Sequence, residues 1–175
     1  MNTYDWDEVF HRLYDKAVKQ YQAGNLNAAA YFDAAETAFL ASIGHTAQEV
    51  FDFAEDACKY GEPSFGTALM IASVRRDYFL VIQKGQSTGR TIRVEDLPAK
   101  DAAVEGIAWL PRIIAKAHAK LRGEMPPDLM FGCGGDRKFL KSVGIHPADF
   151  LRHVWAVGND DAKVIAHVKK QAGQA

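Results

Sequence analysis

The sequence of 175 residues predicts an all-α protein with seven or eight helices packed in one compact domain, residues 1–175. Along most of the chain, apolar residues recur at spacings of three and four, which is typical of helices with one buried face. Most of these segments are followed by a glycine, the residue that commonly ends a helix. The hydrophobic fraction of 48% and the charged fraction of 25% are ordinary for a globular protein, so the chain can bury a core of its own.

The first three helices are predicted from the residues at their ends. Thr46 and Glu49 have the spacing of a complete capping box, in which each side chain is expected to bond to the other residue's backbone amide. Gly24, Gly44 and Gly61 follow the three apolar segments and are expected to end them. The expected helices cover about residues 5–23, 27–42 and 46–60.

The fourth helix is expected over residues 65–81. Apolar residues cover most of its circumference, so it is predicted to be the most buried helix. The polar stretch that follows contains a β-branched segment at residues 91–94. We expect this segment to pair with residues 79–83 in a small β-hairpin.

Four further helices are expected in the second half of the chain. Asp136 is the expected N-cap of the second of these, because glycines at 132–135 disfavour a regular element before it. Gly144 is expected to end that helix. The expected helices cover about residues 109–122, 136–143 and 147–157, with a last one around residues 164–168.

Several residues recur at an offset of 100 positions. The segment 39–44 resembles 139–144, and Lys16 and Glu36 correspond to Lys116 and Asp136. These matches predict two duplicated three-helix units, residues 6–58 and 106–158, around a central segment at 59–105 that holds the buried helix. A ligand pocket would then lie between the halves.

The helical periodicity also predicts a core. The residues expected to be nearly fully buried are Phe39, Leu69, Ala72, Phe79, Ile113, Phe139, Leu140 and Val154.

The charge, the apolar segments and the cysteines of the sequence argue against several classes of function. The net charge is −1 and no long basic block occurs, which argues against a nucleic-acid-binding protein. No apolar run approaches 18 residues, so no membrane span is expected. The acidic N-terminus lacks the apolar segment of a signal peptide. Cys58 and Cys133 have no CxxC spacing, so we expect a cytoplasmic protein with both thiols reduced.

Cys133 is the first candidate for chemistry. It lies among the glycines at 132–135, directly before an expected helix start. Free amides, the positive helix end and Arg137 would favour a thiolate there. Cys133 is therefore interpreted either as a nucleophile beside an anion site or as a loop cysteine packed as a small hydrophobic residue.

A second cluster interrupts the apolar surface of the fourth helix. Arg75 and Arg76 are candidates to hold a carboxylate or phosphate together with Arg137, and Tyr78 and Trp109 could wall such a pocket. A structural ion pair between this cluster and an acidic side chain is the alternative interpretation. The acidic candidates are Glu55, Asp56 and Glu62.

The histidines do not have the spacing of a metal site. No pair follows the HExxH or H-x-E patterns, and no metal ligands are assigned. His45 and His146 lie in expected turns, and His118 is expected to be half exposed. His153 lies three residues after Phe150 and is the preferred candidate for a catalytic base.

Several segments together resemble a known family. They lie at residues 46–53, 60–65, 74–79, 109–112 and 119–124, and around Cys133. They resemble an uncharacterised family of small bacterial proteins, catalogued as a domain of unknown function. The part from about Gly106 onward carries the domain similarity. The resemblance implies a bacterial, soluble protein and transfers no activity, cofactor or catalytic residue.

Two main classes of function remain open from the sequence, with a metalloprotein, which metal analysis of the purified protein would identify, as a third. The first is binding of a small anionic metabolite between the halves, with thiol-assisted chemistry at Cys133. The second is a helical protein-interaction or regulatory module without chemistry, which an exposed apolar patch would indicate. The sequence identifies neither a cofactor nor an oligomeric state, and leaves open whether the protein is an enzyme.

Overall fold

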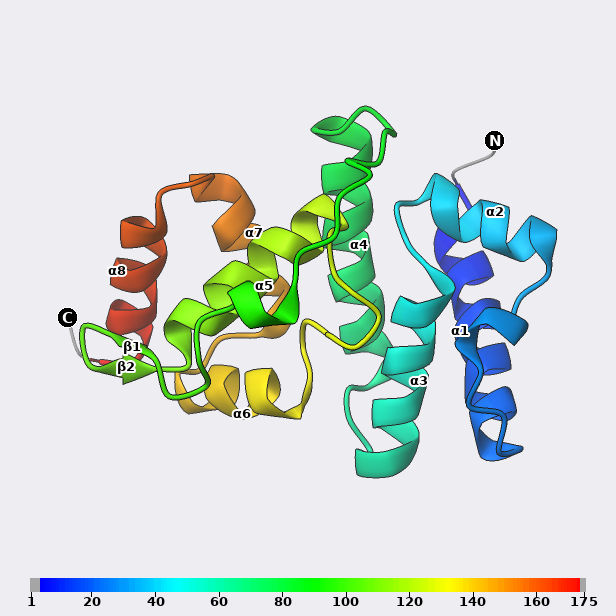
Figure 1. The fold of residues 1–175 in the computed structure, drawn as a ribbon, viewed down its shortest axis with the longest axis horizontal. Coiled ribbons are helices and arrows are strands. Elements are labelled where there is room, and N and C mark those ends of the chain that lie inside the picture. The colour runs from blue at the N-terminus through cyan, green and yellow to red at the C-terminus, as the bar shows by residue number, and fades with distance from the viewer. Residues whose placement is uncertain (1–3, 174–175) are drawn as a thin grey trace. The chain divides into compact units, whose positions relative to one another are not determined.

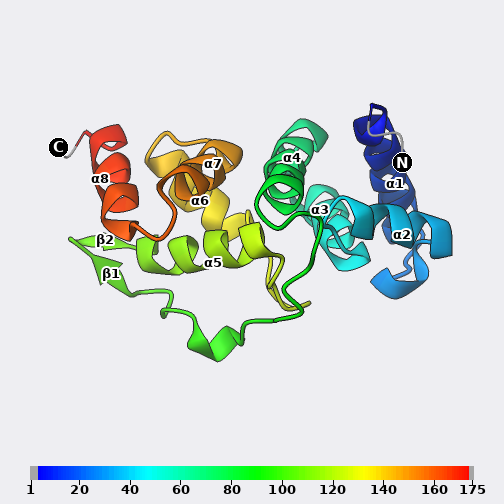
Figure 2. The same ribbon diagram turned by 90° about the horizontal axis from the view of Figure 1, so that it is seen from above.

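The computed structural model describes residues 4–173, and the chain forms two compact units, one ending at Gln86 and the other beginning at Ser87. Within the described residues there are eight α-helices, two 3-10 helices and one small antiparallel sheet (Figures 1 and 2). The predicted all-α class with a small hairpin is confirmed. The organisation of the chain as a single domain stays a prediction.

The first unit is built around the first helix, α1, which packs against α3 and α4. Figure 1 shows α3 beside α1. Its core includes Phe10, Leu40 and Val50, which are fully buried. The elements are α1 (Trp6–Gln22), the 3-10 helix η1 (Ala28–Ala30), α2 (Ala34–Ser42), α3 (Ala47–Tyr60) and α4 (Phe65–Val81).

The expected helix over residues 27–42 is wrong, because the chain forms η1 and then begins α2 at Ala34. The Asp33 side chain accepts a hydrogen bond from Glu36 N at 2.8 Å, and the Glu36 carboxylate accepts one from Asp33 N at 2.9 Å. This reciprocal capping box starts a new helix at this point.

The second unit is built around α5, which packs against α7 and the hairpin, while α7 contacts α6 and α8. The segment from η2 to the hairpin runs along α5 (Figure 2). The elements are the 3-10 helix η2 (Val94–Asp96), β1 (Ala103–Val104), β2 (Ile107–Ala108), α5 (Leu110–Arg122), α6 (Gly134–Ser142), α7 (Pro147–Val157) and α8 (Asp161–Gln171).

The hairpin is not where the sequence analysis placed it. Strands β1 and β2 pair Val104 with Ile107, and the turn between them is made by Glu105 and Gly106, with φ of 49° and 79°. Positive φ at both central residues is the signature of a tight type I′ hairpin turn. Residues 79–81 instead finish α4, and residues 82–83 follow it in a turn, so they do not form the expected strand.

Helix α5, and not α4, is the most buried helix. Eight of the 13 residues of α5 are buried, compared with six of the 17 in α4, which exposes Met70 and Val81. Among the predicted core residues, Leu69, Phe39 and Phe139 are only half-buried. The other five are buried as expected: Ala72, Phe79, Ile113, Leu140 and Val154.

The two units share one local structure at an offset of 100 residues. Gly44 ends α2 with φ of 74°, and Gly144 ends α6 with φ of 68°. The carbonyl of Leu40 accepts from His45 N at 2.8 Å, and the carbonyl of Leu140 accepts from Ile145 N at 3.0 Å. Both turns have the same left-handed helix end. This agreement supports the predicted duplication, which remains a proposal.

Candidate functional site

The start of α6 carries the candidate site. Cys133 is the N-cap, and the next two glycines are already helical, so Asp136 lies in the first turn. The expectation that Asp136 is the N-cap is therefore wrong. The Cys133 side chain makes no capping hydrogen bond. Instead, the Asp136 carboxylate accepts from Gly132 N at 2.9 Å, just before the helix.

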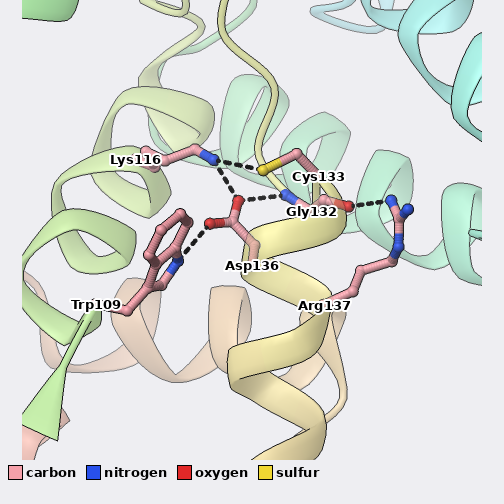
Figure 3. A network of polar contacts seen from close by, with 6 residues as sticks. All are labelled: Trp109, Lys116, Gly132, Cys133, Asp136 and Arg137. Carbon is pink, nitrogen blue, oxygen red and sulfur yellow. Dashed lines mark hydrogen bonds and ion pairs between the residues drawn. The ribbon is translucent and has the colours of Figure 1, made fainter. Parts of the chain in front are cut away.

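The Asp136 carboxylate is the centre of a buried polar network (Figure 3). Asp136 is fully buried. Besides the amide of Gly132, it accepts from Trp109 Nε1 at 2.9 Å and from the ammonium of Lys116, with which it forms an ion pair. Three donors from α5, its N-cap and the loop thus converge on one carboxylate, as a buried charge requires.

The Lys116 ammonium lies between this carboxylate and the thiol (Figure 3). It donates to Cys133 Sγ at 3.3 Å as well as to Asp136, and Lys116 is only 2% exposed. Cys133 itself is half-buried. The ion-paired Lys116 ammonium therefore contacts the sulfur of a half-buried cysteine.

Trp109 shapes the site from the N-terminus of α5. Its φ of 70° is unusual for a bulky residue, and it places the indole against the backbone of Gly135. A Cβ atom at Gly135 would lie 2.5 Å from the Trp109 ring. Glycine at this helical position is thus explained by the close approach of the indole, which the sequence alone did not indicate.

Arg137 stabilises the loop that precedes the helix. Its Nη1 donates to the carbonyl of Gly132 at 2.7 Å, and the side chain is 6% exposed. Of the predicted site residues, the structure therefore brings Trp109, Cys133 and Arg137 together around the start of α6.

The other predicted arginines lie on α4 in the first unit. Arg75 is buried, donates to Gln83 Oε1 at 2.6 Å and stacks over Phe79 at 5.1 Å, and desolvation lowers its pKa. Among the described residues, the polar contacts of Arg75 do not include Glu55, Asp56 or Glu62. Arg76 pairs with Asp77 at 3.1 Å. Tyr78 is half-buried on the same helix.

His153 makes its contacts with α8. Its ring stacks on His167 with centroids 4.0 Å apart, and its Nε2 lies 3.4 Å from the carbonyl of Lys163. Burial lowers the pKa of His167, and His153 and Lys170 lower it further. Among the described residues, none of these contacts joins His153 to Cys133.

Sequence reasoning missed Lys116 and Asp136 as members of the site. Their signal was the recurrence of Lys16 and Glu36 at an offset of 100 residues. Lys16 Nζ lies 2.5 Å from Glu36 Oε2, so the first unit contains a corresponding ion pair. That pair is solvated, with side chains 37% and 26% exposed, whereas the Lys116 and Asp136 side chains are 2% and 0% exposed.

Over residues 4–173, no three His, Cys, Asp or Glu side chains gather in a way that could hold a metal ion. In the same range, no helix is long and apolar enough to cross a membrane.

Comparison with known proteins places one part of the chain. Residues 95–175 match the family model described as domain of unknown function DUF5069. This range covers nearly all of the second unit, including α5, α6 and the Cys133 network. Neither the curated proteins nor the solved structures gave a match.

Proposed function

Taking the match of residues 95–175 to a domain family of unknown function as the premise, we propose that the second unit binds a small anionic metabolite at the start of α6 and uses Cys133 as a thiol nucleophile. One observation carries this proposal. The Lys116 ammonium, buried and held by Asp136, donates to Cys133 Sγ at 3.3 Å. A cation beside a thiol stabilises the thiolate, which is the reactive form.

The first unit provides a reference for a purely structural helix start. There, the position that corresponds to Cys133 is Asp33, whose side chain caps α2 within a capping box. A cap of this kind stabilises a helix by about 1 kcal/mol. In α6, a cysteine without a capping bond occupies this position, and its sulfur contacts the lysine instead. The loss of a stabilising cap supports a role for the thiol.

The anion would be held by the first turn of α6. The free backbone amides and the positive helix end favour a negative group there. In this proposal Arg137 positions the loop through Gly132 and does not hold the ligand itself. The involvement of Arg75, Arg76 and Tyr78, and a pocket between the halves, stay predictions.

The proposed chemistry is addition of the thiolate to an activated carbonyl carbon of the ligand. The thiol first releases its proton to solvent. Cys133 Sγ then forms a bond to the carbon, and the π electron pair of the carbonyl moves to its oxygen. This oxygen takes a proton from the Lys116 ammonium, and the resulting amine regains one from solvent. Reversal of these steps releases the ligand.

Alkylation of single-cysteine variants tests the nucleophile. Burial raises the pKa of Cys58, which disfavours its thiolate at neutral pH. We expect Cys133 in the Cys58→Ser protein to react with iodoacetamide about tenfold faster at pH 7 than Cys58 in the Cys133→Ser protein, because about 1.4 kcal/mol of thiolate stabilisation corresponds to a factor of ten. Mass spectrometry over time gives both rates. Equal alkylation rates at the two cysteines would contradict the proposal that Cys133 is an activated nucleophile.

Replacement of iodoacetamide by iodoacetate tests the anion site separately. The two reagents carry the same leaving group, and only iodoacetate is negatively charged. The proposal predicts a higher ratio of iodoacetate to iodoacetamide rates at Cys133 than at Cys58, because the start of α6 attracts the carboxylate. The same ratio at both cysteines would contradict the anion site, but it would not affect the conclusion about the reactivity of the Cys133 thiol.

A further inference from the structure

A cavity of about 550 Å³ lies within the second unit, apart from the Cys133 network. Its walls come from the segment 92–98, from α5 and from the start of α8. Helix α5 separates it from the network: Ile114, Ala115 and His118 line the cavity, whereas Lys116 points to Asp136. The volume falls in the range of about 300–1,000 Å³ typical of small-molecule sites.

The walls of the cavity are mainly apolar. Leu97, Ile114 and Ile165 are among the aliphatic side chains that line it, together with two prolines. An apolar surface of this kind favours an apolar ligand with few polar groups.

The arginines that line the cavity already have acidic partners. Arg93 binds both carboxylate oxygens of Asp96, at 2.9 and 2.6 Å, and Arg122 Nε donates to Glu124 Oε2 at 2.8 Å. Both guanidinium groups already bind a carboxylate, so an anionic ligand would have to compete with Asp96 or Glu124 for them.

Among the polar side chains that line the cavity, which include Asn159 and Asp161, His118 can offer an acceptor nitrogen to a ligand. Its Nε2 lies 2.9 Å from Asp161 Oδ1, which joins α5 to α8. Because a carboxylate only accepts, Nε2 carries the proton in the neutral ring, and Nδ1 is an acceptor. Nδ1 has no partner within residues 4–173. The Asp161 carboxylate thus fixes the orientation of the ring and leaves Nδ1 as a hydrogen-bond acceptor.

We propose that this cavity binds a small, neutral, apolar molecule that bears one hydroxyl or phenol group. The apolar body lies against Leu97, Ile114 and Ile165, and the hydroxyl donates to His118 Nδ1. This site goes beyond the thiol chemistry proposed for Cys133 and does not depend on it.

A matched pair of probes tests the site. 1-Naphthol carries a hydroxyl donor, and 1-methoxynaphthalene has nearly the same apolar body without the donor. Each is titrated at pH 8, where a typical histidine is neutral, into the full-length protein labelled with ¹⁵N. We expect amide shifts at Ala115, His118 and Ile165 with both probes, and about three- to tenfold tighter binding of 1-naphthol, which corresponds to one hydrogen bond.

Three variants separate the apolar and polar parts of the site. His118→Phe should make the two affinities equal. Ala115→Phe should abolish binding of both probes, because it fills the cavity from α5. Ala166→Phe places the same bulk on an exposed position of α8 outside the cavity and should change neither affinity.

Two outcomes would contradict the proposal. No shift at the cavity residues, with either probe at its solubility limit, would show that the cavity is not a binding site. Equal affinity of the two probes for the unmodified protein would show that His118 does not recognise a hydroxyl.

Discussion

Replacement of Asp136 by alanine is expected to lower the free energy of unfolding of the second unit by about 3–5 kcal/mol, the cost typical of breaking a buried ion pair on one side. The reason is that three donors lose their acceptor at once: the Lys116 ammonium, Trp109 Nε1 and Gly132 N. Urea denaturation followed by tryptophan fluorescence measures the change. Trp109 and Trp155 report on the second unit.

Glu36→Ala is the matched control, because Glu36 occupies the corresponding position in the first unit. Its ion pair with Lys16 is solvated, so the expected cost is only about 1 kcal/mol, including the lost capping bond. If Asp136→Ala and Glu36→Ala lowered the free energy of unfolding by the same amount, burial of the Asp136 network would not increase its contribution to stability, contrary to the expectation.

Gly44→Ala is expected to lower the free energy of unfolding of the first unit by about 2–5 kcal/mol. Two costs combine. A side chain at φ of 74° adopts a left-handed conformation, which costs about 1–2 kcal/mol. The new Cβ would also lie 2.7 Å from Cγ of Phe79, which is 5% exposed, so that the core must shift at a cost of about 1–3 kcal/mol.

Gly144→Ala separates these two costs. Gly144 ends the corresponding helix in the second unit with φ of 68°, but apart from its chain neighbours no atom lies within 4 Å of the position that a Cβ would take. Only the backbone cost of about 1–2 kcal/mol is therefore expected. Thermal or urea denaturation of both variants measures the difference. A Gly44→Ala protein no less stable than Gly144→Ala would exclude the clash with Phe79.

The helices could be predicted because their ends are encoded locally. Thr46 and Glu49 form the capping box that their spacing indicates, with bonds of 3.2 and 3.0 Å. Gly61 ends that helix in the left-handed conformation, with φ of 70°. Both features depend on residues within one helical turn, so the sequence contains the whole signal.

Some errors arose where distant residues decide the local structure, and others where a local signal was missed. Gly135 is helical although glycine disfavours helices. The indole of Trp109 occupies the space that a side chain would need there, which explains the glycine. The Glu105-Gly106 turn is a local signal that was missed, since strands of only two residues leave too short a pattern to recognise.

The candidate site could be predicted only in part. Cys133, Arg137 and Trp109 were recognised by residue type, and the structure brings them together. The roles of Lys116 and Asp136 could not be read from spacing, because 20 residues and a loop separate them. The sequence contained only the recurrence of the pair at an offset of 100 residues, and the structure shows the ion pair in both places.

The most direct test of the thiol site removes the charge beside Cys133 without leaving a lone buried charge. The double variant Lys116→Met and Asp136→Asn, made in the Cys58→Ser protein, keeps the shape of both side chains, and circular dichroism checks its fold. The account predicts that iodoacetamide then modifies Cys133 about tenfold more slowly at pH 7. The corresponding variant Lys16→Met and Glu36→Gln should leave the rate unchanged. An unchanged rate in a folded Lys116→Met, Asp136→Asn protein would contradict the account.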